Sequence, residues 1–220
     1  MLRCHWLDFD LDQCFLNIFA ATLTFSNLID TLTMRLADLI QKITALNEEQ
    51  LATVIASFKP IAAKKNELLL EYGAVADRLF FINSGCLRLY YCNNDQSIIT
   101  RFMAFENTFL TSIVSFISRE SSAEYIQAVE ASELLVITYE DFSNLRKTIP
   151  GWDKMYIYIL EYGLTVITSK LGNLLTQSAA ERYRNLLKNN PELIQRLSNS
   201  NLAAYMNISP ETLSRLKSQI

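Results

Sequence analysis

Apolar residues recur at steps of three and four over residues 152–176, after the breaker Pro150-Gly151, and this stretch constrains the fold most strongly. The spacing predicts one unbroken amphipathic helix, about 40 Å long at 1.5 Å per residue. Its apolar stripe needs a partner. The length of the helix favours parallel pairing with a second copy of the chain, and packing against its own domain is the alternative. The predicted dimer face consists of Trp152, Met155, Ile159, Val166 and Leu174.

The segment before this helix has a different periodicity. Residues 34–58 have helical spacing, and Asn47 with Gln50 matches a capping box that opens a second helix. Between residues 61 and 139 the pattern changes to short alternating or apolar runs, separated by turn sequences such as Asn83-Ser84-Gly85. The predicted strands are Glu67–Tyr72, Leu79–Asn83, Cys86–Cys92, Ser97–Phe102, Tyr125–Val129 and Leu134–Tyr139. Several short antiparallel strands predict an α+β chain with a small β-roll or sandwich.

The first 33 residues differ from the rest, because aromatic residues are spread through an apolar stretch dotted with Thr and Asn. Asp8 and Asp10 lie where a secretion signal needs basic residues, and Asn17 interrupts the apolar run before it can span a bilayer. Met34, which is followed by a clean amphipathic stretch, is a candidate natural start. Residues 1–33 are then a leader of little functional weight.

Four cysteines occur at no metal-ligand spacing in a chain that is too large to depend on disulfides, which favours reduced thiols and a cytoplasmic location. The charge is unevenly divided. Residues 178–220 carry six Lys/Arg against three Asp/Glu, a net charge of +3, whereas residues 1–177 carry 14 against 20, a net charge of −6. A basic tail on an acidic body fits a small phosphate-contacting module, and a solvated basic helix face explains the charge alone equally well.

The tail has the composition of a helix-turn-helix. Ser178 and Glu181 form a second capping-box pattern, and the helix that they begin stops before Pro191. Further along, Ala203 is small enough for two helices to cross closely, and Asn207 can adopt the left-handed conformation in the turn. We therefore predict that residues 199–220 contain a two-helix DNA-reading unit.

The second helix of this unit starts abruptly, because Ser209 is an N-cap and Pro210 an N1 proline. Glu211 can accept from cytosine N4 and Arg215 can bond guanine bidentately, and the two residues share one helix face. The predicted DNA-binding residues are Ser209, Glu211, Thr212, Ser214, Arg215 and Lys217. A structural helical hairpin with an ion pair at i,i+4 is the alternative.

The hexapeptide at 210–215, Pro-Glu-Thr-Leu-Ser-Arg, resembles the recognition helix of Crp/Fnr-type regulators, including its Glu-x-x-Ser-Arg pattern. The resemblance covers about residues 36–220, particularly to the Bacteroidetes-type branch, through Ile82–Tyr91, Phe105–Phe109 and Ser132–Phe142. It implies a cyclic-nucleotide-binding-like β-roll (jelly roll), a long dimer helix and a winged helix-turn-helix. The sequence ends at Ile220, near the expected end of the recognition helix, so the family's wing hairpin is missing from it.

Four segments follow from the periodicity and the resemblance together. They are a leader at 1–33, a sensor roll at 34–150, a dimerisation helix at 151–177 and a helix-turn-helix domain at 178–220. These segments predict a homodimeric transcription regulator that binds a double-stranded DNA operator, with RNA polymerase as a further candidate partner and no membrane association. The alternative is a sensor that acts through protein contacts without specific DNA binding.

Cyclic-nucleotide binders of this family hold the ribose with a Gly-Glu pair and the phosphate with an Arg-Ser pair. Alignment through Phe109 and Tyr125 puts Thr111-Ser112 and Ser122-Ala123 at these positions. Because a buried phosphate without its arginine is costly, we do not expect cyclic AMP or cyclic GMP to bind in the usual manner. Arg119 lies nearby as a substitute contact, which keeps the question open.

The roll can still enclose a pocket for an unidentified small-molecule effector, and a filled roll that serves only as a scaffold is the equal alternative. The candidate pocket residues are Arg88, Thr111, Ser112, Arg119, Ser122 and Tyr125. No cofactor or metal is expected, because the cysteines are scattered and His5 is the only histidine. A single histidine also excludes a cupin-type metalloenzyme, and no phosphate loop or nucleophile triad is present, so the chain is not expected to be an enzyme.

Overall fold

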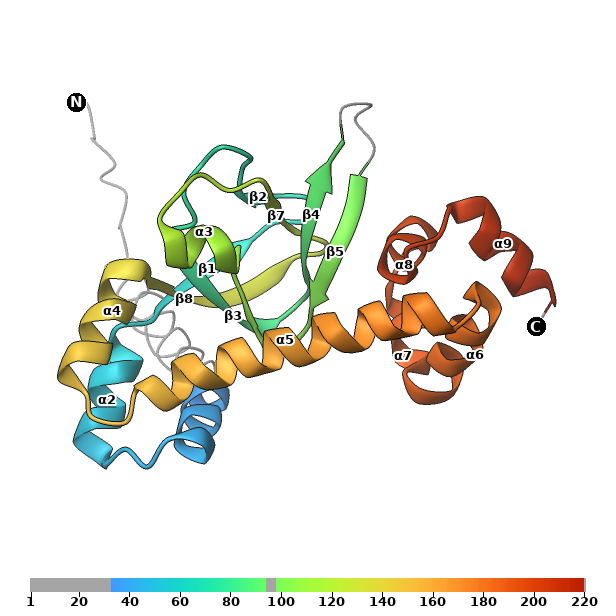
Figure 1. Ribbon diagram of the computed structural model, residues 1–220. Coiled ribbons are helices and arrows are strands. Elements are labelled where there is room, and N and C mark those ends of the chain that lie inside the picture. The colour runs from blue at the N-terminus through green and yellow to red at the C-terminus, as the bar shows by residue number, and fades with distance from the viewer. Residues whose placement is uncertain (1–32, 94–97, 220) are drawn as a thin grey trace, which may run out of the picture.

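The computed structural model describes residues 33–93 and 98–219, which form a β-roll, a long helix and a C-terminal group of helices (Figure 1). The predicted α+β fold with an antiparallel roll is confirmed. Nearly all of the predicted leader, including His5, lies outside the described residues. The strands are β1 (Lys59–Ala63), β2 (Leu68–Leu70), β3 (Arg78–Ser84), β4 (Leu87–Cys92), β5 (Ile98–Ala104), β6 (Phe109–Leu110), β7 (Tyr125–Ala128) and β8 (Ser132–Thr138).

The helices begin with one over residues 33–43. The others are α2 (Glu48–Ala56), α3 (Ile113–Ser118), α4 (Tyr139–Thr148), α5 (Asp153–Thr176), α6 (Ala179–Asn189), α7 (Pro191–Arg196), α8 (Asn199–Met206) and α9 (Pro210–Gln219). Both predicted capping boxes are present, at Asn47 with Gln50 and at Ser178 with Glu181.

Two four-stranded antiparallel sheets make the roll, with strand orders β1-β8-β3-β6 and β2-β7-β4-β5. Strand β1 contains Pro60, which cannot donate to a ladder, and the edge position of β1 explains why the proline is tolerated there. In β3, Leu79 to Ile82 form a continuous buried run between the two sheets and the helices. The roll is therefore closed around one apolar core.

Helix 33–43, α2, α4 and the start of α5 cover one end of the roll (Figure 1). Trp152 and Met155 have no exposed surface, and the Trp152 ring lies edge-on against Phe142 with centroids 5.6 Å apart. These two residues were predicted on the dimer face, and that prediction is wrong, because they fill the intramolecular core. A side chain that is buried within its own chain cannot also form a seam with a second copy.

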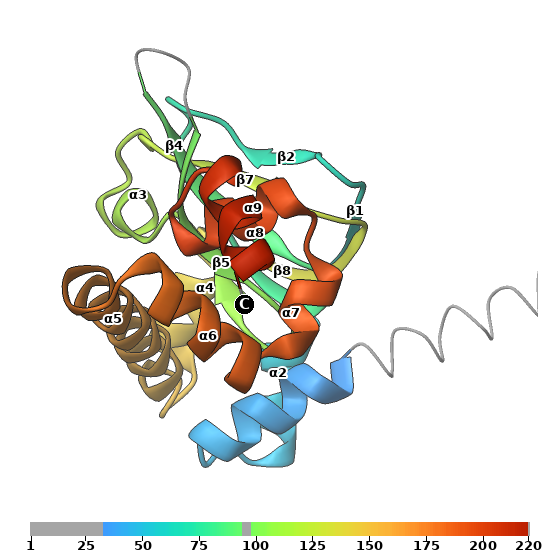
Figure 2. The same ribbon diagram turned by 90° about the vertical axis from the view of Figure 1, so that its right-hand side faces the viewer.

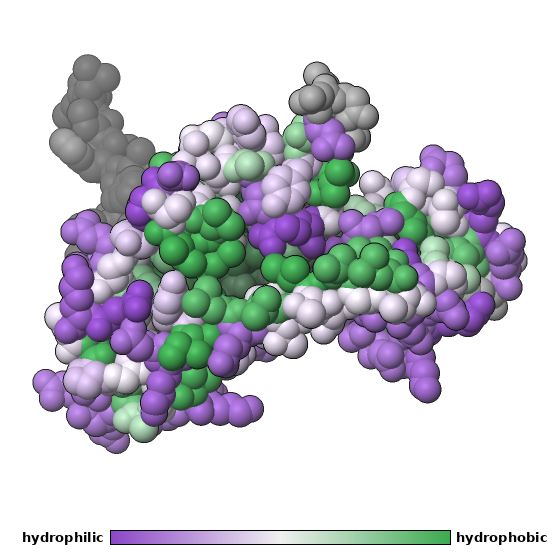
Figure 3. Space-filling view, viewed as in Figure 1, coloured by the Kyte–Doolittle hydropathy of each residue, from purple (hydrophilic) through white to green (hydrophobic). Residues whose placement is uncertain are grey.

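Helix α5 leaves the roll as a long rod, and its faces have different surroundings. Ile159 packs partly buried against the roll core, and Val166 faces a groove between the roll and the C-terminal helices. On another face, apolar residues are exposed in a band along the helix, visible in Figure 3. The members of this band are Ile157, Leu164, Ile167, Leu171, Leu174 and Leu175. Of the predicted dimer residues, only Leu174 lies in it.

The C-terminal helices have a core of their own that continues into the roll. Leu202, Ala203 and Leu213 are buried among them, in the same apolar cluster as Cys86 and Met103 of the roll. Burial raises the pKa of the Cys86 thiol to about 12, so the thiol is neutral. Figure 2 shows the C-terminal helices in front of the roll, with α8 behind α9.

Polar contacts reinforce this apolar docking. The Arg196 guanidinium, at the end of α7, pairs with two carboxylates of the roll, Glu106 at 2.7 Å and Glu130. Burial alone would raise the pKa of Glu106, but hydrogen bonds from Arg196 and from the Gly85 amide outweigh burial and lower the pKa. Arg196 thus links the C-terminal helices to the roll through two ion pairs.

Gly85 lies in the tight turn between β3 and β4, and a substitution there tests how closely this turn packs against the roll. It has a φ of +103°, and a Cβ atom there would lie 2.2 Å from Ser132 Oγ. Gly73 also has a positive φ, +83°, but no atom lies within 4 Å of its Cβ position. Gly85→Ala should therefore lower the free energy of unfolding by about 1–3 kcal/mol more than Gly73→Ala, measured by urea denaturation. Equal losses in the two variants would contradict the steric argument.

Candidate functional site

The helix-turn-helix is built around a left-handed residue. Asn207 ends α8 with a φ of 54° and a ψ of 49°, as the sequence predicts, and the Ile208 amide donates to the Ala203 carbonyl at 3.0 Å. This turn brings α9 across α8. Because Leu213 and Leu216 are buried against α8, the opposite face of α9 points to solvent.

That outer face carries most of the predicted DNA-binding residues. Ser209 Oγ accepts from the Thr212 amide at 3.2 Å and caps the helix. Glu211, Ser214 and Arg215 are exposed. A hydrogen bond from Ser209 lowers the pKa of Glu211, so its carboxylate is charged at neutral pH. Donor and acceptor groups are therefore displayed together on one exposed helix surface.

Both cations of α9 make local contacts within the chain. Arg215 Nη2 donates to Thr212 Oγ1 at 3.2 Å, which holds the guanidinium along the exposed face. Lys217 Nζ donates to Asn199 Oδ1 at 2.6 Å, near the start of α8. Lys217 thus lies beside the first helix, at the edge of the surface that contains Glu211 and Arg215.

Inside the roll, the structure brings together two of the six candidate effector residues. Ser122 Oγ donates to Ser112 Oγ at 3.0 Å, and Ser112 Oγ donates to Glu124 Oε2 at 2.7 Å. The Glu124 side chain is almost fully buried, and Arg101 pairs with it through both nitrogens of its fork, Nε with Oε1 and Nη2 with Oε2. A buried ion pair therefore occupies the place where the sequence alignment expects a phosphate-binding Arg-Ser.

Sequence reasoning missed Glu124 and Arg101. A signal for Glu124 was available, because it directly precedes β7 and continues the alternation of the buried residues Ile126 and Ala128 in that strand. A carboxylate on the inward face of a strand needs a buried partner. Nothing local to Arg101 identified it as that partner, since the two residues lie 23 positions apart.

Three of the candidate effector residues are directed elsewhere. Arg88 donates to Gln127 and lies over the Tyr90 ring, and Tyr125 stacks on the same ring with centroids 5.0 Å apart. Arg119 pairs with Asp77 at 2.8 Å and stacks on an aromatic ring of α4, so it does not approach Ser122 as a substitute phosphate contact. The prediction of one cluster of six residues is wrong, because these arginines satisfy neighbouring strands and helices.

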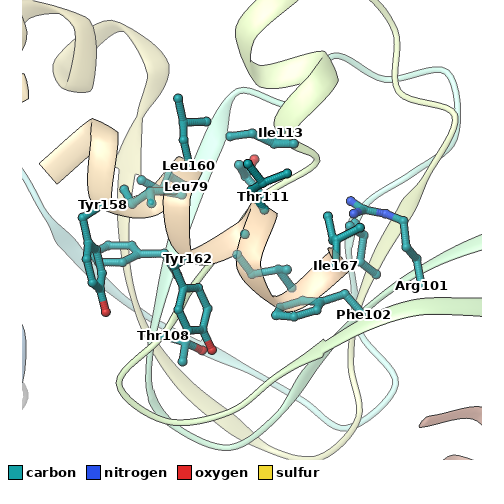
Figure 4. Close-up of a pocket in the computed structure, with 16 residues that line it drawn as sticks. Leu79, Arg101, Phe102, Thr108, Thr111, Ile113, Tyr158, Leu160, Tyr162 and Ile167 are labelled. Atoms are coloured by element: carbon teal, nitrogen blue, oxygen red, sulfur yellow. The ribbon is translucent and has the colours of Figure 1, made fainter. Parts of the chain in front are cut away.

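Thr111, the remaining candidate, borders an apolar cavity of about 250 Å³ between the roll and α5 (Figure 4). Its hydroxyl donates to the Arg78 carbonyl at 2.9 Å. Tyr158 and Tyr162 of α5 face the roll across this cavity, and Arg101 is the one charged residue that lines it among the described residues. Because Glu124 neutralises Arg101, the cavity suits a small uncharged group.

Residues 60–148 match the family model of the cyclic nucleotide-binding domain. The roll is therefore similar in fold to the domains of this family. No curated protein matches the sequence significantly. The match to this family concerns the fold of the roll. In this chain the roll contains the Arg101–Glu124 ion pair.

Several solved structures are similar in fold to most of this chain. The c-di-GMP-responsive global regulator CLP of Xanthomonas campestris is 19% identical with a TM-score of 0.64, covering 79% of this chain and 91% of that one. FixK2 of Bradyrhizobium japonicum is 16% identical with a TM-score of 0.63, covering 74% and 83%. A protein of Eubacterium rectale described as a transcriptional regulator of the Crp/Fnr family is 16% identical with a TM-score of 0.62, covering 78% and 82%. The resemblance to Crp/Fnr regulators is confirmed at the level of the fold.

No helix within 33–93 and 98–219 combines the length and the apolar character that crossing a membrane requires. The same residues contain no group of three or more His, Cys, Asp or Glu arranged to hold a metal ion.

The Arg101–Glu124 pair can be tested by a double-mutant cycle. Arg101→Met should lower the free energy of unfolding by about 3–5 kcal/mol, because it leaves the Glu124 carboxylate buried without a cation. The double variant Arg101→Met/Glu124→Leu should recover most of that loss, since no charge remains to be desolvated. Urea denaturation of the four proteins measures the cycle. Additive losses would show that the pair is not coupled.

Proposed function

We propose that this chain is a sequence-specific DNA-binding transcription regulator that acts as a homodimer. The observation that carries the proposal is the exposed face of α9, where Glu211, Ser214 and Arg215 are presented to solvent on a helix whose other face is buried. The shared fold of the Crp/Fnr regulators supports the same conclusion. On this proposal, α9 enters the major groove of the operator.

The charge of the C-terminal domain supports phosphate contact. Residues 178–220 carry a net charge of +3 in a chain with a net charge of −3. The affinity for DNA depends on the local neutralisation of phosphates, so an acidic sensor domain does not prevent binding by a basic tail. Lys217, at the edge of α9, is suited to a phosphate contact and Arg215 to base reading.

The exposed apolar band on α5 supports the dimer. Five residues of this band, together with the half-buried Leu160, follow the alternating steps of three and four that bring side chains to one seam of a coiled coil. The five are Ile157, Leu164, Ile167, Leu171 and Leu174. Leu164 is 68% exposed and Leu171 54% exposed, and large leucines in a row are unfavourable in water. Pairing with the same face of a second copy buries them and places two recognition helices on one side of the dimer.

The roll acts in this proposal as an effector domain that does not take a cyclic nucleotide in the usual manner. Glu124 supplies a buried negative charge where a cyclic phosphate would need positive charge, and Arg101 is already engaged by it. Bringing a phosphate beside this carboxylate costs both desolvation and repulsion. The apolar cavity between the roll and α5 is the better candidate for a small uncharged effector.

Arg215→Ala should reduce discrimination at one base pair of the operator by about 1–3 kcal/mol, because it removes a bidentate contact to a base edge. The operator would first be found by selection from random duplexes, with half-sites about 34 Å apart. Recovery of no enriched sequence would sink the proposal and favour a regulator that works through protein contacts.

Lys217→Ala is the matched comparison on the same helix. It should weaken binding to all sequences alike and reduce the slope of log affinity against log salt concentration by about 1, because it removes one phosphate contact. If Lys217→Ala changed the sequence preference and Arg215→Ala did not, the assigned roles of the two residues would be reversed.

Leu164→Glu should convert the dimer into a monomer in sedimentation velocity and abolish cooperative binding to the two half-sites, since it puts a charge in the centre of the seam. Lys154→Glu adds a carboxylate at an exposed site outside the apolar band of α5 and should leave the dimer intact. A wild-type protein that sediments as a monomer at high micromolar concentration would refute the α5 seam.

A further inference from the structure

A groove of about 790 Å³ runs between the roll, α5 and the C-terminal helices. It is separate from the surface assigned to DNA and shares only Leu174 with the proposed dimer seam. Its walls come from β5, from α5 and from α6 and α8, which Figure 1 shows converging at the far end of the roll. The groove is large enough for a nucleotide-sized molecule. Any molecule bound there would touch both domains.

The charge in this groove is unbalanced. Lys170 of α5 and Arg182 of α6 both line it, and no Asp or Glu among the described residues does. Two acidic residues of the roll are engaged by other arginines, Glu124 by Arg101 and Glu106 by Arg196. Two cations in a partly enclosed cleft without a carboxylate create a positive potential that favours an anion.

Lys170 is held against the backbone of β5. Its ammonium donates to the Arg101 carbonyl at 2.9 Å and lies 3.5 Å from the Thr100 carbonyl. Burial, together with the nearby positive charge of Arg101, lowers the pKa of Lys170 to about 8. Two carbonyl oxygens do not neutralise an ammonium, so a negatively charged ligand would find an incompletely paired donor here.

Arg182 stands at the junction of α5 and α6. Its Nη1 donates to the Gln177 carbonyl at 2.8 Å and its Nη2 lies 3.4 Å from the Met206 carbonyl. The buried Nε–H has no acceptor among the described residues. A buried guanidinium nitrogen without an acceptor is rare in proteins, so the Arg182 guanidinium is incompletely paired where the residue lines the groove.

The uncharged walls of the groove narrow the class of ligand. Aromatic rings of β5, α5 and α8 line it, including Phe102, Tyr162 and Tyr205. Amide side chains line it as well, among them Asn173, Asn185 and Asn207. Rings that stack on a base, amides that pair with its edges and cations that hold a phosphate are together the chemistry that recognises a nucleotide.

We propose that this interdomain groove binds a nucleoside phosphate, with Lys170 and Arg182 as the phosphate contacts. The site differs from the interior of the roll, where the cation Arg101 is already paired with Glu124. A ligand in the groove would also bear on the orientation of the DNA-binding domain, because Asn207 Nδ2 in the turn donates to the Thr100 carbonyl at 3.1 Å. Only this last consequence rests on the DNA-binding function proposed above.

Direct binding is the test. Adenosine and guanosine 5′-monophosphates and their 3′,5′-cyclic forms would be titrated into the full-length protein by calorimetry, with the unphosphorylated nucleosides as comparison ligands. At least one nucleotide should bind, and its nucleoside should bind far more weakly. Failure of all four nucleotides at about 1 mM, or nucleoside binding of equal strength, overturns the proposal.

The variant Lys170→Met tests whether the nucleotide binds in the groove. It should weaken nucleotide binding by about 30-fold or more without lowering the thermal midpoint, because it removes a buried ammonium that no carboxylate compensates. Lys154→Met on the same helix and Arg184→Gln on α6 remove exposed cations outside the groove and should bind like the wild type. A Lys170→Met protein with unchanged affinity, or a Glu124→Gln protein that gains affinity independently of Lys170, would place the ligand in the roll and overturn the proposal.

The pH dependence gives a second readout. A bound phosphate stabilises the Lys170 ammonium and raises its pKa, so affinity should fall as the pH rises from about 7.5 to 9.5 through the unliganded value of about 8. The other ionisable groups around the groove are Arg101 on β5, Arg182 on α6, Tyr162 on α5 and Tyr205 on α8, and burial raises the pKa of both tyrosines further above this window. Lys170→Arg keeps the charge and should bind with a flat profile. Equal slopes in wild type and Lys170→Arg would contradict the assignment.

DNA binding separates the two proposals. If a nucleotide binds and changes operator affinity, both stand. If a nucleotide binds with the expected Lys170 dependence but no duplex is ever selected, the groove stands and the DNA-binding proposal fails. If duplexes are selected but no nucleotide binds, the groove proposal fails alone.

Discussion

The burial of Trp152 and Met155 at the start of α5 fixes the rotation of the whole helix. Both side chains are fully buried against the roll and its covering helices, which sets the direction of every later residue along a 24-residue rod. Lys170 is turned toward β5 as a result, and Leu164 and Leu171 are turned to solvent. The groove, the proposed dimer seam and the position of the recognition helix all follow from this one anchored turn.

Charge is distributed between the two cavities in opposite ways. Within the roll, Glu124 and Arg101 neutralise each other, and the cavity between the roll and α5 is lined by apolar side chains. In the interdomain groove, Lys170 and Arg182 are not neutralised by any carboxylate of the described residues. Uncompensated charge in a cleft is unfavourable unless a counter-charge binds there. The proposal of a phosphate site in the interdomain groove, and not inside the roll, rests on this difference.

The two domains are joined by contacts that differ in their physical nature. Arg196 binds Glu106 and Glu130 through charge, whereas Phe105 lies edge-on to Tyr205 with ring centroids 6.3 Å apart. Strand β5 contributes a backbone contact between the domains, because its Thr100 carbonyl accepts a hydrogen bond from Asn207 Nδ2. Strand β5 also carries Arg101. One strand therefore connects the ion pair inside the roll with Asn207 in the turn between α8 and α9. Such a route couples the sites only if a ligand prefers one arrangement of this strand.

The sequence by itself determined most strands of the roll, the long helix after Pro150-Gly151, both capping boxes and the left-handed turn at Asn207. Each of these depends on residues within a few positions of one another, where spacing and backbone preference act directly. Only the tertiary structure decided which face of α5 is buried, because apolar residues cover most of that helix and periodicity alone does not rank them. It also decided that Arg88 and Arg119 leave the roll interior and that Arg101 and Glu124 meet there. Pairings between residues distant in sequence depend on strand register and packing, which no local pattern specifies.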